Sequence, residues 1–288
     1  MRWLHGMVLF LAASALAGCS GLGLLNATVS LDGYRIERDI AFGPDPRQRY
    51  DLYVPEGASG SAPAVVFFYG GAWTGGRKQD YLFVGEALAT RGYVVAIPDY
   101  RVFPQIRFPE FLADNAAAVS AIRRDLAARN LASGALALVG HSAGAYNAAM
   151  LALDPQWLAK AGVDRCRDIS AVVALAGPYD FLPLSGRSLK AVFGEFEPLA
   201  ETQPISFART PAPPMLLLAG RNDATVLPRN TLALAAAMQA AGGKVQTKLY
   251  DNVAHADIVA SFAKLLRGTP PSLDDTDRFL AANRGAGC

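Results

Sequence analysis

Gly140-His141-Ser142-Ala143-Gly144 is the stretch that decides the fold. The apolar run 135–139 precedes it, and an alanine-rich segment over 142–153 follows it as an expected helix. Strand, tight turn and helix in this order are the setting of a nucleophile elbow, which lifts a serine hydroxyl clear of the backbone. The two glycines allow the cramped turn. Since Gly-x-Ser-x-Gly also arises by chance, the rest of the chain has to support this interpretation.

A serine nucleophile needs a base, and the chain has three histidines. His5 lies in a leader segment that we expect to be removed. His141 stands beside Ser142 inside the elbow, where its ring cannot readily reach that hydroxyl. His255 follows the strand-like run 245–250 and is therefore the predicted base. The alternative is a histidine that caps the helix after it.

The third member is a carboxylate that orients the imidazole and stabilises its protonated form. Asp223 is the first choice because it follows the apolar run 215–220 and so lies at the carboxyl end of a buried strand. Asp180 has a similar position one strand earlier and is the main rival. Asp251 and Asp257 are too near His255 in the sequence to be preferred.

A tetrahedral intermediate carries a negative oxygen that backbone N–H groups must stabilise. One donor is expected from Ala143, the residue after the nucleophile. The other is expected from the loop Gly70-Gly71-Ala72, which follows a strand expected near 64–69, and either Gly71 or Ala72 could supply it. The alternative is an ordinary glycine turn next to a core Trp73.

With these residues, the chain resembles the α/β-hydrolase superfamily, and most closely the esterase branch with His-Gly-Gly-x-Trp and Gly-His-Ser-Ala-Gly motifs. That branch includes carboxylesterases, bifunctional feruloyl and acetylxylan esterases, and kynurenine formamidase. The resemblance covers roughly 34–268 and extends to the segments 50–55, 98–101 and 220–228. The chain order Ser142, Asp223, His255 is that of the superfamily. Tyr69 replaces the usual loop histidine, which braces the loop in the branch, so we expect the oxyanion site to survive with altered fine geometry.

Strand-like and helical runs alternate along the chain. Strands are expected at 34–41 and 49–54 and near 64–69, 93–98, 135–140, 170–176, 214–219 and 245–250, with helices near 79–90, 109–129, 142–153, 229–241 and 256–267. This pattern predicts an α/β fold with a mostly parallel eight-stranded sheet and helices on both faces. A short cap is expected at about 180–213, and its apolar side chains either line an acyl pocket or bury against the sheet.

The first residues indicate export. Arg2 precedes a short apolar stretch that ends in Leu16-Ala17-Gly18-Cys19, which resembles a bacterial lipobox. The resemblance implies a signal peptide over 1–18, an acylated Cys19, and a lipid anchor in the bacterial envelope. Ser20 favours the outer membrane, facing the periplasm. Residues 19–33 are expected to be a tether and 34–288 the hydrolase domain. A plain secretory signal with an incidental cysteine is the alternative.

Cysteine use agrees with an oxidising compartment. With Cys19 assigned to lipid, Cys166 and Cys288 remain, and we expect them to pair and hold the C-terminal tail. Two free thiols are the alternative.

Composition limits the function classes. The chain is 52% hydrophobic and 18% charged with a net charge of +2, which indicates a sizeable core and gives no reason to expect nucleic acid as a partner. No metal-ligand spacing or phosphate-binding loop is present in the sequence, so no metal and no cofactor are expected; the oligomeric state stays open.

The sequence therefore predicts an anchored serine esterase that acts on a small-molecule or cell-surface ester. Two alternatives stay open. The same residues would serve an amide hydrolase such as a formamidase or peptidase, although export makes kynurenine formamidase a poorer match. A non-catalytic envelope lipoprotein on a hydrolase scaffold is the other.

Overall fold

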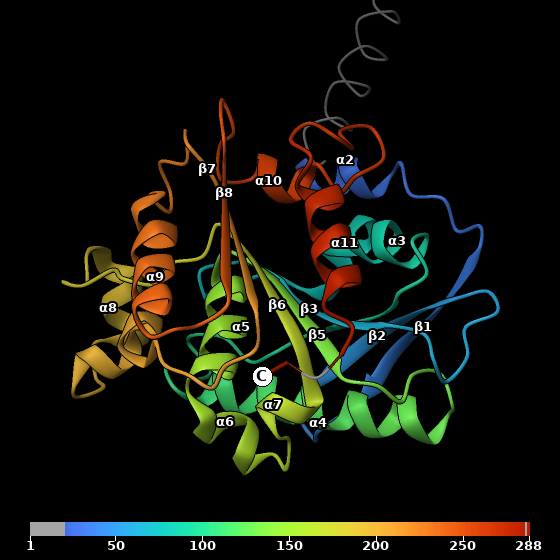
Figure 1. Cartoon of the computed structure of the whole chain (residues 1–288), viewed down its shortest axis with the longest axis horizontal. Helices are drawn as coiled ribbons and strands as arrows, with labels where there is room; N and C mark the ends of the chain where they lie inside the picture. The colour runs from blue at the N-terminus through green and yellow to red at the C-terminus, as the bar shows by residue number, and fades with distance from the viewer. Residues whose placement is uncertain (1–20, 286) are drawn as a thin grey trace, which may run out of the picture.

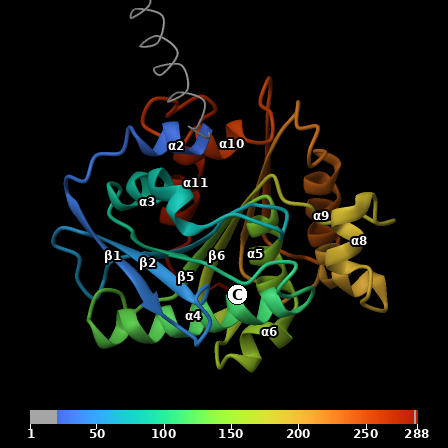
Figure 2. The same ribbon diagram turned by 180° about the vertical axis from the view of Figure 1, so that it is seen from behind.

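An eight-stranded sheet runs through the middle of the molecule, with helices on both sides (Figures 1 and 2). The computed structural model describes residues 21–285 and 287–288. The strand order is β1-β2-β4-β3-β5-β6-β7-β8; β2 is antiparallel to both β1 and β4, and all other neighbours are parallel. The strands are β1 (Tyr34–Ala41), β2 (Arg49–Pro55), β3 (Ala64–Phe68), β4 (Val94–Pro98), β5 (Leu136–His141), β6 (Ile169–Leu175), β7 (Met215–Gly220) and β8 (Val245–Tyr250). The predicted sheet is confirmed.

The central strands are apolar along their whole length. Every residue of β3, β4, β5, β6 and β7 is buried, as expected for parallel strands that helices cover on both faces. In β8, at one edge of the sheet, half-buried and exposed residues alternate instead. The carboxyl ends of the parallel strands therefore form one rim, where side chains from distant segments can meet.

The helices vary from one turn to five. They are α2 (Gly21–Asn26), α3 (Leu82–Ala89), α4 (Glu110–Ala128), α5 (Ala143–Leu153), α6 (Pro155–Lys160), α7 (Arg165–Asp168), α8 (Gly186–Phe193), α9 (Arg229–Ala240), α10 (Asp257–Ala260) and α11 (Ser272–Ala282), with short 3₁₀ turns at Lys78–Tyr81, Leu199–Thr202 and Pro204–Phe207. In the two opposite views α11 and α4 lie on opposite faces of the sheet (Figures 1 and 2). An ion pair from Arg91, just after α3, to Asp274 joins α3 to α11.

The expected helix over 256–267 is wrong in extent. Only Asp257–Ala260 is α-helical, and the chain then continues in turns. Leu265 and Leu266 are exposed, so this stretch has no continuous apolar face to bury. The C-terminal helix α11 was not anticipated, although Pro270-Pro271 precedes it and acidic residues occupy its first turn, as is common at helix starts.

The described part of the expected tether contains a short helix. From Gly21 the chain forms α2, which packs against α3 and against the 3₁₀ turn Lys78–Tyr81 that precedes α3. Asn26 holds it there, since its side chain donates to the carbonyl of Gln79 at 2.8 Å and accepts from the N–H of Phe83 at 3.1 Å. Leu22 and Leu25 are partly buried against the core. Small residues suggested a flexible linker, but the two partly buried leucines pack this segment against the domain.

Candidate active site

Ser142 sits in the turn between β5 and α5 with backbone angles φ 55° and ψ −121°, outside the usual regions for a residue with a side chain. Close packing holds the turn in this conformation. A Cβ on Gly140 would lie 2.3 Å from the carbonyl oxygen of Gly144, and one on Gly144 would lie 1.9 Å from that of Phe68. Glycine is thus required at both positions, because the elbow, the first turn of α5 and the end of β3 approach backbone to backbone.

The structure brings Ser142, His255 and Asp223 together. The Nε2 atom of His255 lies 2.9 Å from Oγ of Ser142, and its Nδ1 atom lies 2.8 Å from Oδ2 of Asp223. Both separations are hydrogen-bond distances. His255 comes from the loop between β8 and α10, and Asp223 from the turn after β7, so all three lie at the carboxyl ends of strands.

Asp223 is buried and held from two sides. Its other carboxylate oxygen, Oδ1, accepts from the N–H groups of Thr225 at 2.9 Å and Val226 at 2.8 Å. Burial alone would raise the pKa of this carboxyl, but the hydrogen bonds from His255 and the two N–H groups outweigh it, so the pKa is lowered. Asp223 is therefore an anion suited to stabilise a protonated imidazole.

The three rival carboxylates lie elsewhere. The backbone N–H of Asp180 donates to Asn230, and no interaction joins the Asp180 side chain to His255. Asp251 pairs with Arg221, and Asp257 accepts from the N–H of Ala254. None of them provides an oxygen to the imidazole.

The loop after β3 has three consecutive residues with positive φ: Gly71 at 143°, Ala72 at 51° and Trp73 at 57°. Such angles are strained for Ala72 and Trp73. Ala72 and Ala143 line the same cavity as Ser142, whereas Gly70 and Gly71 do not. The N–H of Ala143 begins α5 and has no intrahelical acceptor. Ala72 is thus better placed than Gly71 to supply the second oxyanion donor.

Gly70 and Gly71 have packing roles instead. A Cβ on Gly70 would lie 3.0 Å from Cβ of Ser142, and one on Gly71 would lie 2.3 Å from the carbonyl oxygen of Gly75. Gly70 therefore lets the loop pass directly over the nucleophile, and Gly71 lets it close on itself.

Tyr69, which stands where the resembling branch has histidine, braces this loop. Its hydroxyl donates to Oδ1 of Asp99 at 2.7 Å and accepts from Arg47 at 3.0 Å. Arg47 also donates to the carbonyl of Gly76, and Asp99 accepts from the N–H of Lys78, so the far end of the loop is tied to the same cluster. Asp99 lies in the segment 98–101 that carries part of the family resemblance, but no role was predicted for it, and Arg47 was not singled out at all.

A cavity of about 610 Å³ opens beside Ser142. The apolar side chains of the cap divide between the two expected roles. Phe181, Leu182 and Leu189 line the cavity, while Val192 and Phe193 are buried. Trp73 contacts both groups, since it lines the cavity and its ring makes an edge contact with the buried Phe193 at 4.8 Å. Its Nε1 atom donates to Asn147 at 3.0 Å.

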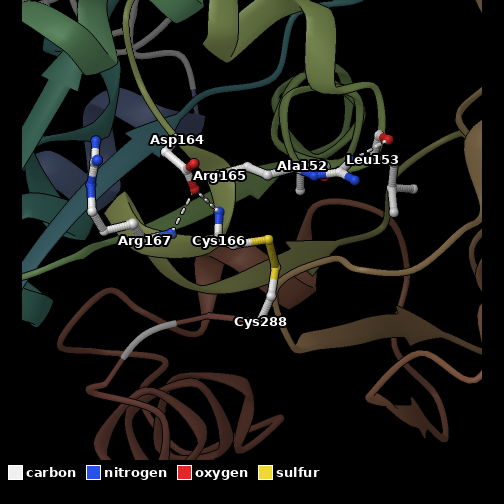
Figure 3. Close-up of a disulfide and its surroundings, with 7 residues drawn as sticks. All are labelled: Ala152, Leu153, Asp164, Arg165, Cys166, Arg167 and Cys288. Carbon is white, nitrogen blue, oxygen red and sulfur yellow. Dashed lines mark hydrogen bonds between the residues drawn. A yellow bond between two sulfur atoms is a disulfide. The ribbon is translucent and has the colours of Figure 1, made fainter.

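Cys166 and Cys288 form a disulfide in the structure, with their Cα atoms 4.7 Å apart (Figure 3). The side chain of Asp164 accepts from the N–H groups of Cys166 and Arg167, which positions the cysteine at the start of α7. The N–H of Gly287 donates to the carbonyl of Cys166, so the tail is held at two adjacent points. The predicted lipidation residue, Cys19, lies outside the described residues.

The chain has the α/β-hydrolase fold, as the order of its strands and the turn at Ser142 show. A Ser–His–Asp arrangement lies at the rim of its sheet. Residues 50–238 match the model of the BD-FAE family. The chain therefore belongs to the BD-FAE family.

The chain is also similar to individual proteins of known name. The chain is 30% identical over 244 residues to an isoprenylcysteine alpha-carbonyl methylesterase of Arabidopsis thaliana, which covers 78% of this chain and 57% of the relative. It is 29% identical over 178 residues to the kynurenine formamidase of Danio rerio, covering 60% of this chain and 55% of the relative. The chain thus spans little more than half the length of either. Esterase B from Lactobacillus rhamnosis shares the fold, with a TM-score of 0.78 at 19% identity over 98% of this chain and 95% of that one.

Proposed function

We propose that this protein is a serine hydrolase that cleaves carboxylic esters through an acyl-enzyme on Ser142. The observation that carries the proposal is the continuous hydrogen-bonded path from Oγ of Ser142 through His255 to Asp223, at 2.9 Å and 2.8 Å. The esterase names among similar proteins and the BD-FAE family support the same reaction class.

His255 takes the proton of Ser142 as the hydroxyl oxygen attacks the ester carbonyl. The negative oxygen that forms is stabilised by N–H groups of Ala143 and Ala72. His255 then gives its proton to the leaving alcohol, and the acyl group stays on Ser142. A water molecule, deprotonated by His255, attacks the acyl-enzyme and releases the acid. Asp223 remains an anion throughout and stabilises the imidazolium.

The test is hydrolysis of p-nitrophenyl acetate together with labelling by a fluorophosphonate probe. The intact chain should turn over the ester and take up the probe, while Ser142→Ala should lose about 10⁶ in kcat and all labelling, with its circular dichroism unchanged. Retained turnover by Ser142→Ala would refute the mechanism. Absence of labelling in the unsubstituted chain would favour a non-catalytic lipoprotein.

An amide hydrolase would use the same residues, and one relative is a formamidase. Acetate esters, formanilides and dipeptide anilides offered side by side distinguish these activities. We expect the esters to be cleaved with the highest kcat/KM, because an alcohol or phenol leaves the tetrahedral intermediate more readily than an amine does. A higher kcat/KM on a formanilide would overturn the ester assignment.

We further propose that the protein is exported and anchored in the bacterial envelope by lipid on Cys19. The motif Leu16-Ala17-Gly18-Cys19 supports this, and a Cys166–Cys288 disulfide is consistent with an oxidising compartment. Among the described residues, no helix is both long and apolar enough to cross a bilayer. Fractionation with Cys19→Ala tests the anchor: the variant should move from the membrane to the soluble fraction.

A further inference from the structure

The cavity beside Ser142 has an apolar wall and a single charge. Phe181, Leu182 and Leu189 come from the cap, and Val226 and Leu227 from the turn before α9. Among the described residues that line the cavity, Arg229 alone carries a charge, and no carboxylate lines it. A neutral apolar ester would contact the apolar wall, but it would have no group that interacts with the guanidinium of Arg229.

Arg229 has no counter-charge of its own. It is exposed, and among the described residues it forms no ion pair and no side-chain hydrogen bond, whereas most arginines of the chain are paired. Asp180, the acidic residue at the start of the cap, does not line the cavity and makes no ion pair with Arg229. The guanidinium is therefore free to bind an anion that enters the cavity.

The backbone at Arg229 is held in place by its neighbours. It is the first residue of α9, which has no acidic residue in its first turn and no side-chain cap. The buried Asn230 beside it accepts from the N–H groups of Tyr179 and Asp180, which holds the start of α9 against the segment after β6. Figure 1 shows α9 next to the cap helix α8 at one end of the sheet. Both helices thus present residues to one cavity, with the serine on its floor.

We propose that Arg229 selects esters whose apolar portion ends in a carboxylate. This rests on the proposed ester hydrolysis and adds the substrate class to it. The ester carbonyl lies at Ser142, the methylene chain follows Phe181, Leu182 and Leu227, and the terminal carboxylate meets the guanidinium, whose fork geometry matches a carboxylate.

The test compares two substrates that differ only at the far end: p-nitrophenyl hexanoate and the mono-p-nitrophenyl ester of adipic acid. The quantity measured is the ratio of kcat/KM for the adipate ester to that for the hexanoate ester. Arg229→Gln should lower this ratio about fivefold, mainly through KM, because an exposed ion pair contributes at most about 1 kcal/mol. Arg229→Lys should keep part of the preference, and Arg229→Glu should lower the ratio further.

Lys244→Gln is the matched control. The Lys244 side chain is exposed and forms no ion pair among the described residues. Lys244 follows the C-terminal end of α9, and α9 separates that end from Arg229 by about 18 Å. The control should leave the ratio unchanged. Raising NaCl from about 20 mM to about 500 mM should lower the ratio for the unsubstituted chain and much less for Arg229→Gln. An equal ratio in the unsubstituted chain and Arg229→Gln would overturn the proposal.

A binding measurement separates this proposal from ester hydrolysis itself. Calorimetric titration of Ser142→Ala with monomethyl adipate and methyl hexanoate reads the same preference without turnover. If the unsubstituted chain cleaves neither ester but Ser142→Ala binds the adipate ester more tightly through Arg229, ester hydrolysis fails and the anion preference stands. If both esters are cleaved with no dependence on Arg229, the anion preference alone fails.

Discussion

The Nε2 N–H of His141 donates a hydrogen bond of 3.1 Å to the backbone carbonyl of His255. The residue next to the nucleophile therefore supports the loop that carries the base, and the two rings lie 5.0 Å apart. His141 is buried, and this burial is the main reason that its pKa is lowered to about 3. A neutral His141 is thus part of the folded structure.

The buried His141 predicts loss of stability in acid. Its pKa is about 6.5 when unfolded and about 3 when folded, so between these values the unfolded chain binds a proton that the folded chain does not. The free energy of unfolding should therefore fall as the pH decreases from about 6.5 to about 3, by up to about 5 kcal/mol from this group. Urea unfolding at several pH values measures it. His141→Gln, which does not titrate, should show a shallower decline; an equal slope would contradict the assignment.

Asp223→Asn tests the choice of carboxylate. The variant keeps the shape of the side chain but removes the anion that stabilises the imidazolium, so kcat should fall by about 10⁴. Asp180→Asn is the matched control and should change kcat by less than about threefold, since its carboxylate does not contact His255. A larger effect at Asp180 would move the acid to that residue. Steady-state kinetics on a short-chain p-nitrophenyl ester give both numbers.

Gly144→Ala tests the packing of the elbow. Its Cβ would lie 1.9 Å from the carbonyl oxygen of Phe68, and backbone has to move to accommodate it. We expect a decrease of about 2–3 kcal/mol in the free energy of unfolding and a large loss of kcat. Gly134→Ala is the control, because no atom lies within 4 Å of its added Cβ. Equal stability of the two variants in thermal and urea unfolding would show that the elbow is looser than described.

Tyr69→Phe tests the brace of the oxyanion loop. The variant leaves Asp99 buried with one hydrogen bond fewer, which should cost about 1–3 kcal/mol of stability. Because the loop carries Ala72, kcat should fall more than KM rises. Tyr53→Phe is the matched control: the Tyr53 hydroxyl is buried without a partner among the described residues, so its removal should cost little. Tyr69→His should recover part of the lost kcat if the position serves as a brace.

The disulfide predicts a redox-dependent stability. In a Cys19→Ser chain, thiol titration after denaturation should detect no free thiol before reduction and Cys166 and Cys288 after it. Because the bond closes a separation of 122 residues, Cys288→Ser should lower the free energy of unfolding by about 2–4 kcal/mol. Its kcat should be unchanged, since Cys166 lies in α7, directly before β6, and so at the opposite end of the parallel strands from the catalytic rim. Two reactive thiols without reduction would exclude the pairing.

Several features were predictable from local sequence. The Gly-x-Ser-x-Gly elbow needs only short-range constraints: glycine where backbone meets backbone, and an apolar strand before the turn. Apolar runs of five to seven residues likewise predict buried parallel strands. With few histidines in the chain, elimination pointed to His255. These conclusions depend on residue types and neighbours, which the chain carries in its order.

Other features depended on packing between distant segments. Whether Asp223 or Asp180 meets His255 is decided by how β7 and β8 lie side by side, and both acids follow similar strands. Phe181 lines the cavity while Phe193 is buried, although both belong to the same apolar cap segment. Leu22 and Leu25 pack against the core, and α2 contacts α3 and the turn before it, so part of the expected tether is helical.

The sequence by itself determined the elbow, the sheet and the set of candidate groups. Only the tertiary structure decided which carboxylate faces the imidazole, that Ala72 rather than Gly71 faces the cavity, and that Arg47 and Asp99 hold Tyr69. The physical reason is that a turn is governed by steric limits over a few residues, whereas a hydrogen bond between residues tens of positions apart exists only after the whole core has packed.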